Sequence, residues 1–417
     1  MDPHFLFVSS LLPDKDPTTG YEIANQAIVA AYRRQGVRLT LAGFRRPGAA
    51  IPEGAISLGD LAIENAGASR WQKMRWVAEA MMSNRPIAAA KVASYGRRRL
   101  LERLAEAGPI DGLILNSIQM PAAYPFLARA HPSIFIAHNV EHKSASGNAE
   151  SAAGRLSRLL YRREASLLKQ AEARICRDAV VVHTLSAEDA TGLGLAGAEK
   201  CLPLALSVGR SALPDTGERR HDVGLIGTWS WAPNRIGLDW FVSEVAPRLP
   251  AGITVAIAGR FDGPPPSAPE NVRFVGRVPD AQAFVNASRV VALATKGGTG
   301  VQLKTLETFE EGMPAVATPQ ALRGIDSLPA NVRIAEAADD FASALVELVE
   351  AERTGRLARL DGGAFARSQT EALDRAVAAG LHRFARESDR RSAAAMSSPE
   401  PARRAEVTRP ARQIGGL

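Results

Sequence analysis

The fold is decided by residues 290–307, which read VVALATKGGTGVQLKTLE. The apolar start predicts a buried strand that ends at Ala294, and a turn rich in glycine follows at Gly297–Gly300. A helix then begins and carries Lys304 and Glu307, three residues apart on neighbouring faces. The first N–H groups of a helix have no partner within it, so with the helix dipole they form a phosphate site. The stretch predicts an anion-binding strand–turn–helix unit, and an ordinary unit of this kind without a ligand is the alternative.

The two charged side chains of this helix suit different parts of a nucleotide. Lys304 supplies a point charge for a diphosphate. Glu307 offers two acceptor oxygens for the paired hydroxyls of a ribose. Gly312 and Pro314 end the helix, because glycine caps helix C-termini and proline prevents continuation.

Short apolar runs alternate with longer amphipathic stretches along most of the chain, which predicts α/β structure with doubly wound parallel sheets. Helices are expected over 21–35, 155–173, 240–249 and 340–351. Strands are expected over 5–8, 37–42, 113–115, 134–138, 179–183, 223–226, 253–258, 272–275, 290–294, 315–317 and 332–334.

The alternation breaks once, at the aperiodic residues 207–221, which predicts two domains. The first covers residues 1–207 and the second 208–386, with a last helix near 366–386 that crosses back to the first domain. Residues 387–417 hold no aromatic side chain and are predicted to be a disordered tail. Ligands are expected at the carboxyl ends of the strands.

Composition excludes several classes of protein. With 417 residues and 46% hydrophobic residues the chain can build real cores, while Cys176 and Cys201 cannot form a disulfide framework or a zinc site. No signal peptide or membrane-spanning stretch is visible, which predicts a cytoplasmic protein, or one held peripherally on the inner face of the membrane. The net charge of +7 favours anionic partners, although a merely basic surface explains it as well.

Residues 298–307 and the turn at 312–318 resemble the nucleotide-sugar glycosyltransferases of the group 1, or family 4, kind. The resemblance implies a GT-B fold, in which two Rossmann-like domains face each other across a cleft. It implies that Glu307 binds the nucleotide ribose and that Lys304, with the amides near Gly300 and Val301, contacts the diphosphate. Many members carry two glutamates with seven residues between them, and here Thr299 stands at the position of the first. This departure bears on the contact with the donor sugar.

Further pieces match the same family. Gly227 lies in the opening of the predicted donor domain, and Arg260 ends the next strand, where it reaches the diphosphate or simply covers the cleft. In the first domain Thr19 and Gly20 correspond to a glycine-rich turn near the diphosphate and the acceptor. His138 stands at a strand end that faces the donor, and a hydrogen-bonded structural histidine is its alternative. Glu141 is the candidate base if the reaction inverts the anomeric configuration.

Three other features are interpreted as structural. Glu164 lies on a helix predicted to be exposed and basic, and Ser186 fits the N-cap of the next helix. Residues 192–197 match the spacing of a dinucleotide-binding loop, but a short helix precedes them instead of a strand, so a plain loop is predicted.

Two basic stretches of the first domain leave alternatives open. One begins at 70–76 with two tryptophans, and the other covers 155–174 with a stripe of leucines. Basic amphipathic helices with tryptophan lie on anionic membranes. Packing against the sheet is the other interpretation, equal for the first stretch and favoured for the second. Nucleic-acid binding is not expected, because no recognised binding module accompanies the charge.

These observations predict a glycosyltransferase of the hexosyltransferase class that moves a sugar from a nucleotide diphosphate sugar to a glycan or lipid-linked acceptor. Retention is expected, with a role in exopolysaccharide or cell-surface glycan synthesis. No cofactor and no metal are expected. The rivals are a nucleotide-sugar epimerase on the same fold and a non-catalytic nucleotide-binding subunit of a polysaccharide assembly complex.

Overall fold

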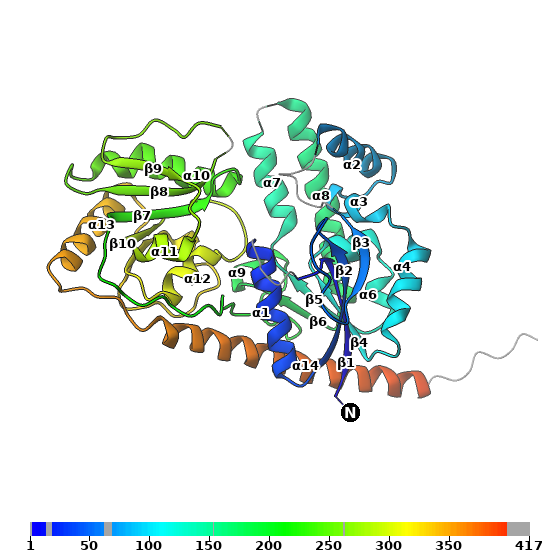
Figure 1. The fold of residues 1–417 in the computed structure, drawn as a ribbon. Coiled ribbons are helices and arrows are strands. Elements are labelled where there is room, and N and C mark those ends of the chain that lie inside the picture. The colour runs from blue at the N-terminus through cyan, green and yellow to red at the C-terminus, as the bar shows by residue number, and fades with distance from the viewer. Residues whose placement is uncertain (1, 14–18, 62–68, 153, 262, 398–417) are drawn as a thin grey trace, which may run out of the picture.

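The computed structural model describes residues 2–13, 19–61, 69–152, 154–261 and 263–397. Its strands form two separate parallel sheets, each covered by helices (Figure 1). This confirms the α/β, GT-B type of architecture expected from the sequence. The sheets fall on either side of the boundary predicted between residues 207 and 208, and the boundary itself stays a prediction.

The first sheet has the order β3-β2-β1-β4-β5-β6. The strand β3 was not predicted, because the run ISLGD is short and is interrupted by a glycine. The strands are β1 (His4–Leu11), β2 (Arg38–Arg45), β3 (Ile56–Asp60), β4 (Gly112–Asn116), β5 (Ser133–Ala137) and β6 (Val181–Thr184). The helices are α1 (Gly20–Arg34), α2 (Arg70–Met82), α3 (Ile87–Ala93), α4 (Arg97–Leu104), α5 (Gln119–Ala123), α6 (Leu127–Ala130), α7 (Glu141–Ser151), α8 (Arg155–Asp178) and α9 (Ala187–Gly192).

The second sheet has the order β12-β11-β10-β7-β8-β9, which repeats the strand order of the first sheet. Its strands are β7 (His221–Thr228), β8 (Val255–Arg260), β9 (Val272–Gly276), β10 (Ser288–Leu293), β11 (Ala315–Ala317) and β12 (Val332–Ile334). Its helices are α10 (Ala232–Trp240), α11 (Ala281–Asn286), α12 (Leu303–Glu310) and α13 (Ala338–Arg353). The helix expected at 240–249 is wrong in extent: Pro233 starts α10 near 232, and short π and 3₁₀ turns cover 241–248.

A single long helix, α14 (Gly362–Ser397), runs along both domains (Figure 1). It contacts α12 of the second domain and α1 and β6 of the first. Phe384 packs edge-on against Phe5 with their ring centroids 4.8 Å apart, which fixes the helix on the first sheet. The helix continues through 387–397, so the prediction of a disordered tail is wrong for these residues. Alanine-rich residues near 393–395 favour a helix even without aromatic contacts. Residues 398–417 lie outside the described residues.

The linker between the sheets is held by the end of α12. The Glu310 carboxylate accepts hydrogen bonds from the Ser207 hydroxyl at 2.8 Å and from the backbone N–H groups of Val208 at 2.7 Å and Gly209 at 3.0 Å. Although the linker sequence lacks periodicity, its path is fixed because the buried Glu310 carboxylate accepts hydrogen bonds from several linker residues.

Candidate functional site

The strand order places one topological switch point in each sheet, between β1 and β4 and between β7 and β10. Ligands of open α/β sheets bind beyond the carboxyl ends of strands at such points. The predicted site residues follow the carboxyl ends of strands at or beside these two points.

The turn between β10 and α12 adopts the conformation that its glycines allow. Gly298 and Gly300 have φ values of 92° and 80°, in the left-handed region that other residues avoid. A Cβ atom added at Gly300 would lie 2.0 Å from Asn139 Oδ1, so the turn lies directly against the segment after β5. From here on we call residues 297–302 the donor loop.

Two more contacts join the donor loop and the start of α12 to the first domain, and a third is made by Gly324, which lies beside the donor loop. Thr299 Oγ1 lies 2.5 Å from Ser144 Oγ on α7. A Cβ atom at Gly20 would lie 3.1 Å from Leu303 Cδ1, the first residue of α12. Val301 is close to Gly324, which in turn touches the Leu185 carbonyl after β6. The structure therefore brings Thr299, Gly300 and Val301 together with the first-domain segments that the sequence placed across the cleft.

Lys304 lies on the first turn of α12, as predicted. Its Nζ donates to Asn234 Oδ1 at 3.2 Å and lies 6.0 Å from the centroid of the Trp229 ring. Burial lowers the pKa of Lys304 to about 8, because a charged amine is poorly solvated there. An anionic ligand would remove this penalty, so the site is suited to a diphosphate.

Glu307 faces the linker one turn further along α12. Its Oε1 lies 3.5 Å from Arg210 Nη1. Burial raises the pKa of Glu307 and the Arg210 charge opposes that rise. The long ion pair leaves acceptor capacity on the carboxylate, as binding a ribose requires.

Gly227 and Arg260 lie at the ends of β7 and β8, on the same edge of the second sheet. A Cβ atom at Gly227 would lie 3.0 Å from the Trp229 ring, and the Trp229 indole N–H donates to the Ala258 carbonyl at 2.9 Å. The absence of a side chain at Gly227 therefore makes room for a buried indole. Arg260 is exposed at the strand end.

His138 directly follows β5 and is buried. Its Nε2 donates to Asn116 Oδ1 at 2.8 Å, and its ring lies 4.8 Å from the ring of Tyr21. With Asn116 accepting, the imidazole proton resides on Nε2 and Nδ1 is an acceptor. Burial lowers the pKa of His138 to about 4, so the ring is neutral at physiological pH.

The partner of His138 belongs to a polar network that our sequence reasoning missed. Asn116 Nδ2 donates to Ser9 Oγ at 3.2 Å, Tyr21 OH at 3.1 Å and Asn25 Oδ1 at 2.8 Å. The network spans the switch point between β1 and β4. The signal was present, because Asn116 directly follows the predicted strand 113–115, as His138 follows its own strand.

Glu141 begins α7 beside this network. Asn139 Nδ2 donates to its Oε1 at 3.5 Å, and its own N–H donates to Glu172 Oε1 at 2.7 Å. Burial raises the pKa of Glu141, and the nearby carboxylates of Glu172 and Glu164 raise it further. The group is therefore a weaker acid than usual, as a general base requires.

Thr19 caps α1 in a capping box, with its hydroxyl accepting from Glu22 N at 3.4 Å. Ser186 caps α9 as predicted. Glu164 is structural as predicted, but the expected exposure is wrong: it is buried and accepts from the N–H groups of Ile87 at 2.8 Å and Ala88 at 3.3 Å, at the start of α3.

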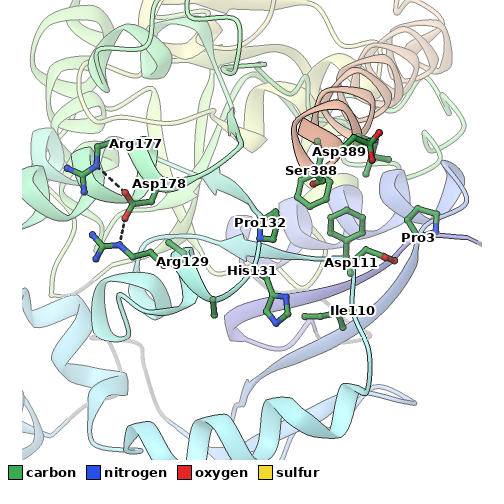
Figure 2. Close-up of a pocket in the computed structure, with 16 residues that line it drawn as sticks. Pro3, Ile110, Asp111, Arg129, His131, Pro132, Arg177, Asp178, Ser388 and Asp389 are labelled. Atoms are coloured by element: carbon green, nitrogen blue, oxygen red, sulfur yellow. Dashed lines mark hydrogen bonds and ion pairs between the residues drawn. The ribbon is translucent and has the colours of Figure 1, made fainter. Parts of the chain in front are cut away.

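A cavity of about 1120 Å³ lies at the opposite edge of the first sheet, beneath the end of α14 (Figure 2). Pro3, Asp111 and Pro132 border it near the amino ends of their strands, and Asp178 there pairs with Arg129 and Arg177. None of the predicted site residues lines this cavity. Because ligands of such sheets bind at the carboxyl ends, the residues that follow the carboxyl ends of the strands are the better candidate site.

Two further observations concern the described part of the chain. No helix there is both long and apolar enough to cross a bilayer. No group of three or more histidine, cysteine or acidic side chains there is arranged to hold a metal ion. The expectation of a reaction without cofactor or metal stays a prediction.

The two-sheet fold, together with a family match over part of the chain, supports a glycosyltransferase enzyme with the GT-B fold. Residues 220–351 match the model of the family described as Glycosyl transferases group 1, so the second domain is a group 1 glycosyltransferase domain. A comparison with curated proteins gives no match.

Solved structures are similar over nearly the whole chain. Sucrose-phosphate synthase from Thermosynechococcus elongatus has a TM-score of 0.60 and 14% identity, covering 95% of this chain and 100% of that one. HepE from Anabaena, in complex with UDP and glucose, has a TM-score of 0.56 and 14% identity, covering 91% and 99%. The catalytic domain of starch synthase IV from Arabidopsis thaliana, bound to ADP and acarbose, has a TM-score of 0.56 and 11% identity, covering 93% and 99%. At these identities the likeness establishes the shared fold.

Proposed function

We propose that this glycosyltransferase takes its sugar from a nucleoside diphosphate sugar held by the donor loop and α12, and transfers it to a glycan or lipid-linked acceptor with retention. The observation that carries the proposal is the placement of Lys304 and Glu307 on α12, with the donor loop touching Asn139 across the cleft. Similar structures hold UDP or ADP, which agrees with a donor of this class.

The chemistry follows from the groups at the site. Bond breaking at the anomeric carbon leaves negative charge on the diphosphate. The ammonium of Lys304 and the free N–H groups at the start of α12 stabilise that charge. Contacts between the donor loop and the first domain exclude water from the reacting centre and so limit hydrolysis of the donor.

Neutral His138 stands at the end of β5, where its backbone lies beside Gly300 of the donor loop, and its proton resides on Nε2. The ring therefore offers an acceptor nitrogen to a sugar hydroxyl and adds no charge. The setting in exopolysaccharide or cell-surface glycan synthesis, with a peripheral position on the membrane, is part of the proposal. It is supported by the basic first domain discussed below.

Donor binding is tested first, by thermal unfolding against a panel of nucleoside diphosphates and their sugars. A ligand at 100 times its Kd stabilises the fold by about 2.7 kcal/mol. We expect a shift with one base, lost in Glu307→Ala and kept in Glu347→Ala, an exposed glutamate on α13 that serves as the matched control. No shift with any nucleotide from a well-folded sample would overturn the proposal and favour the non-catalytic subunit.

Retention is tested with the donor found in that panel. The anomeric configuration of the product, read by NMR, is expected to equal that of the donor. Glu141→Gln is expected to keep most of the turnover, because a retaining reaction needs no base there. An inverted product, together with a loss of about 10²–10⁴-fold in Glu141→Gln, would make Glu141 the general base instead.

A further inference from the structure

The exposed face of α2 carries an unusual set of side chains. Trp71 and Met82 are 79% and 83% exposed, and Met74 and Met81 are exposed as well. At 3.6 residues per turn these four fall within about 100° of one another. The residues that α2 buries, Trp76 and Ala80, lie on the other side of the helix. The outward face is therefore an apolar stripe, and such stripes normally face a core or a partner.

The first two turns of α8 share this character. Leu156 and Leu159 are 71% and 65% exposed, whereas the regular series of buried residues in α8 begins only at Glu164. The expectation that the leucines of this stretch pack on the sheet is therefore wrong for these two, although it holds for Leu168. It fails because the described part of the chain leaves residues 155–159 of α8 exposed and begins to bury the helix at Glu164.

The two exposed elements lie together at the upper edge of the first domain (Figure 1). The Arg163 guanidinium on α8 donates to the Ala80 carbonyl at 2.8 Å and to Asn84 Oδ1 at 3.3 Å, at the end of α2. Both elements are basic. Residues 155–163 hold four arginines and no acidic residue, and residues 70–85 hold four basic residues and one acidic residue.

We infer that α2 and residues 155–162 of α8 dock the enzyme on an anionic lipid bilayer, with the tryptophan, methionines and leucines in the interface and the arginines at the phosphates. Charge complementarity selects this occupant, because apolar side chains flanked by arginines match the acyl boundary and the anionic headgroups together. The arginine stems extend along the apolar surface while their charges stay in the polar layer.

The position of this surface relative to the cleft suits an acceptor carried on a lipid. The helix α7 begins at the cleft with Glu141 and ends beside the start of α8, and its 11 residues span about 16 Å. This inference deepens the proposed function, since it names what brings the acceptor to the site. Vesicle binding is measured without donor or acceptor, so its failure is distinguishable from failure of the glycosyltransfer proposal.

The test is co-sedimentation of the full chain with vesicles of phosphatidylcholine, alone or with roughly a quarter of phosphatidylglycerol. We expect binding to the anionic vesicles only, weakened at about 1 M salt, where the Debye length falls to about 3 Å. Replacing Arg155, Arg158 and Arg162 by glutamine is expected to lower the partition coefficient about fivefold for each arginine. Trp71→Ser with Met82→Ser is expected to lower it at least tenfold.

Ile334→Ser is the matched control, because this side chain is also exposed and apolar but lies on β12 of the other domain. Its partition is expected to equal that of the wild type. Thermal unfolding and nucleotide binding of each variant check that the fold is intact. Wild-type protein that binds neither vesicle, or variants that bind like the wild type, would overturn the inference. So would a wild-type dimer without lipid that the same variants dissociate, because the surface would then join two copies of the chain.

Discussion

The two sheets share one strand order, yet their switch points are built differently. At the first, side chains dominate: Asn116 connects Ser9, Tyr21, Asn25 and His138 in a buried network. At the second, backbone dominates: Gly298 and Gly300 of the donor loop have left-handed conformations, and the N–H groups at the start of α12 follow directly. The charged side chains that α12 contributes are Lys304 and Glu307. A fixed network suits the placement of one neutral ring, whereas open backbone suits an anion that approaches closely.

The largest expected effect is on turnover, from a substitution of Lys304 at the second switch point. The proposed function makes Lys304 the cation that stabilises the leaving diphosphate, so Lys304→Ala is expected to lower kcat/KM by about 10²–10³-fold. Steady-state release of nucleoside diphosphate measures the change. Lys304→Arg keeps the charge and is expected to recover a part of the loss. If Lys304→Ala has the same kcat/KM as the wild type, the diphosphate is stabilised by backbone N–H groups and not by the Lys304 ammonium.

Asn116→Leu removes the central residue of the hydrogen-bond network at the first switch point. The Nε2–H of His138 then loses its acceptor, and Ser9 Oγ, Tyr21 OH and Asn25 Oδ1 lose the amide N–H donor that Asn116 supplies. The free energy of unfolding is therefore expected to drop by about 1–3 kcal/mol. Urea unfolding measures it.

Asn116→Asp tests whether the His138 ring acts in turnover, and the pH profile of kcat/KM is the measurement. In the wild type the pKa of His138 is about 4, so its titration leaves activity flat between pH 5 and 8. A carboxylate beside the ring raises that pKa, and a new titration should enter this window. A profile unchanged in this variant would show that the ring does not act in turnover.

A moderate effect concerns pH at the second switch point. The pKa of Lys304 is about 8 without ligand, and a bound diphosphate raises it because the charges attract. The affinity is therefore full below about pH 8 and falls as the pH rises, at most about tenfold per pH unit. Calorimetric titration at several pH values measures Kd, and Lys304→Arg should give a flat curve.

The smallest effect concerns the contact between the domains. The hydroxyls of Thr299 and Ser144 pair across the cleft, and each change to alanine is expected to cost about 1 kcal/mol or less. A double-mutant cycle on the free energy of unfolding should give a coupling of about 0.5–1 kcal/mol. Additive costs would mean that the pair does not hold the cleft closed.

The sequence by itself determined the parallel α/β class, the place of the donor loop and the helix that carries Lys304 and Glu307. These depend on local chemistry: strand apolarity, glycines in a left-handed turn and helix capping act within a few residues. His138 was also found locally, since it directly follows a predicted strand.

Only the tertiary structure decided what these groups contact. Asn116 is 22 residues from His138 in sequence, and Thr299 is 155 residues from Ser144. Crossover connections bring such pairs together, and no local pattern encodes which strand ends meet. Exposure was likewise decided by packing: Glu164 is buried because α3 begins against it, while Leu156 lies in the first turns of α8, which no described element buries. Helical periodicity predicts which residues share a face, but the neighbouring elements determine whether that face is covered.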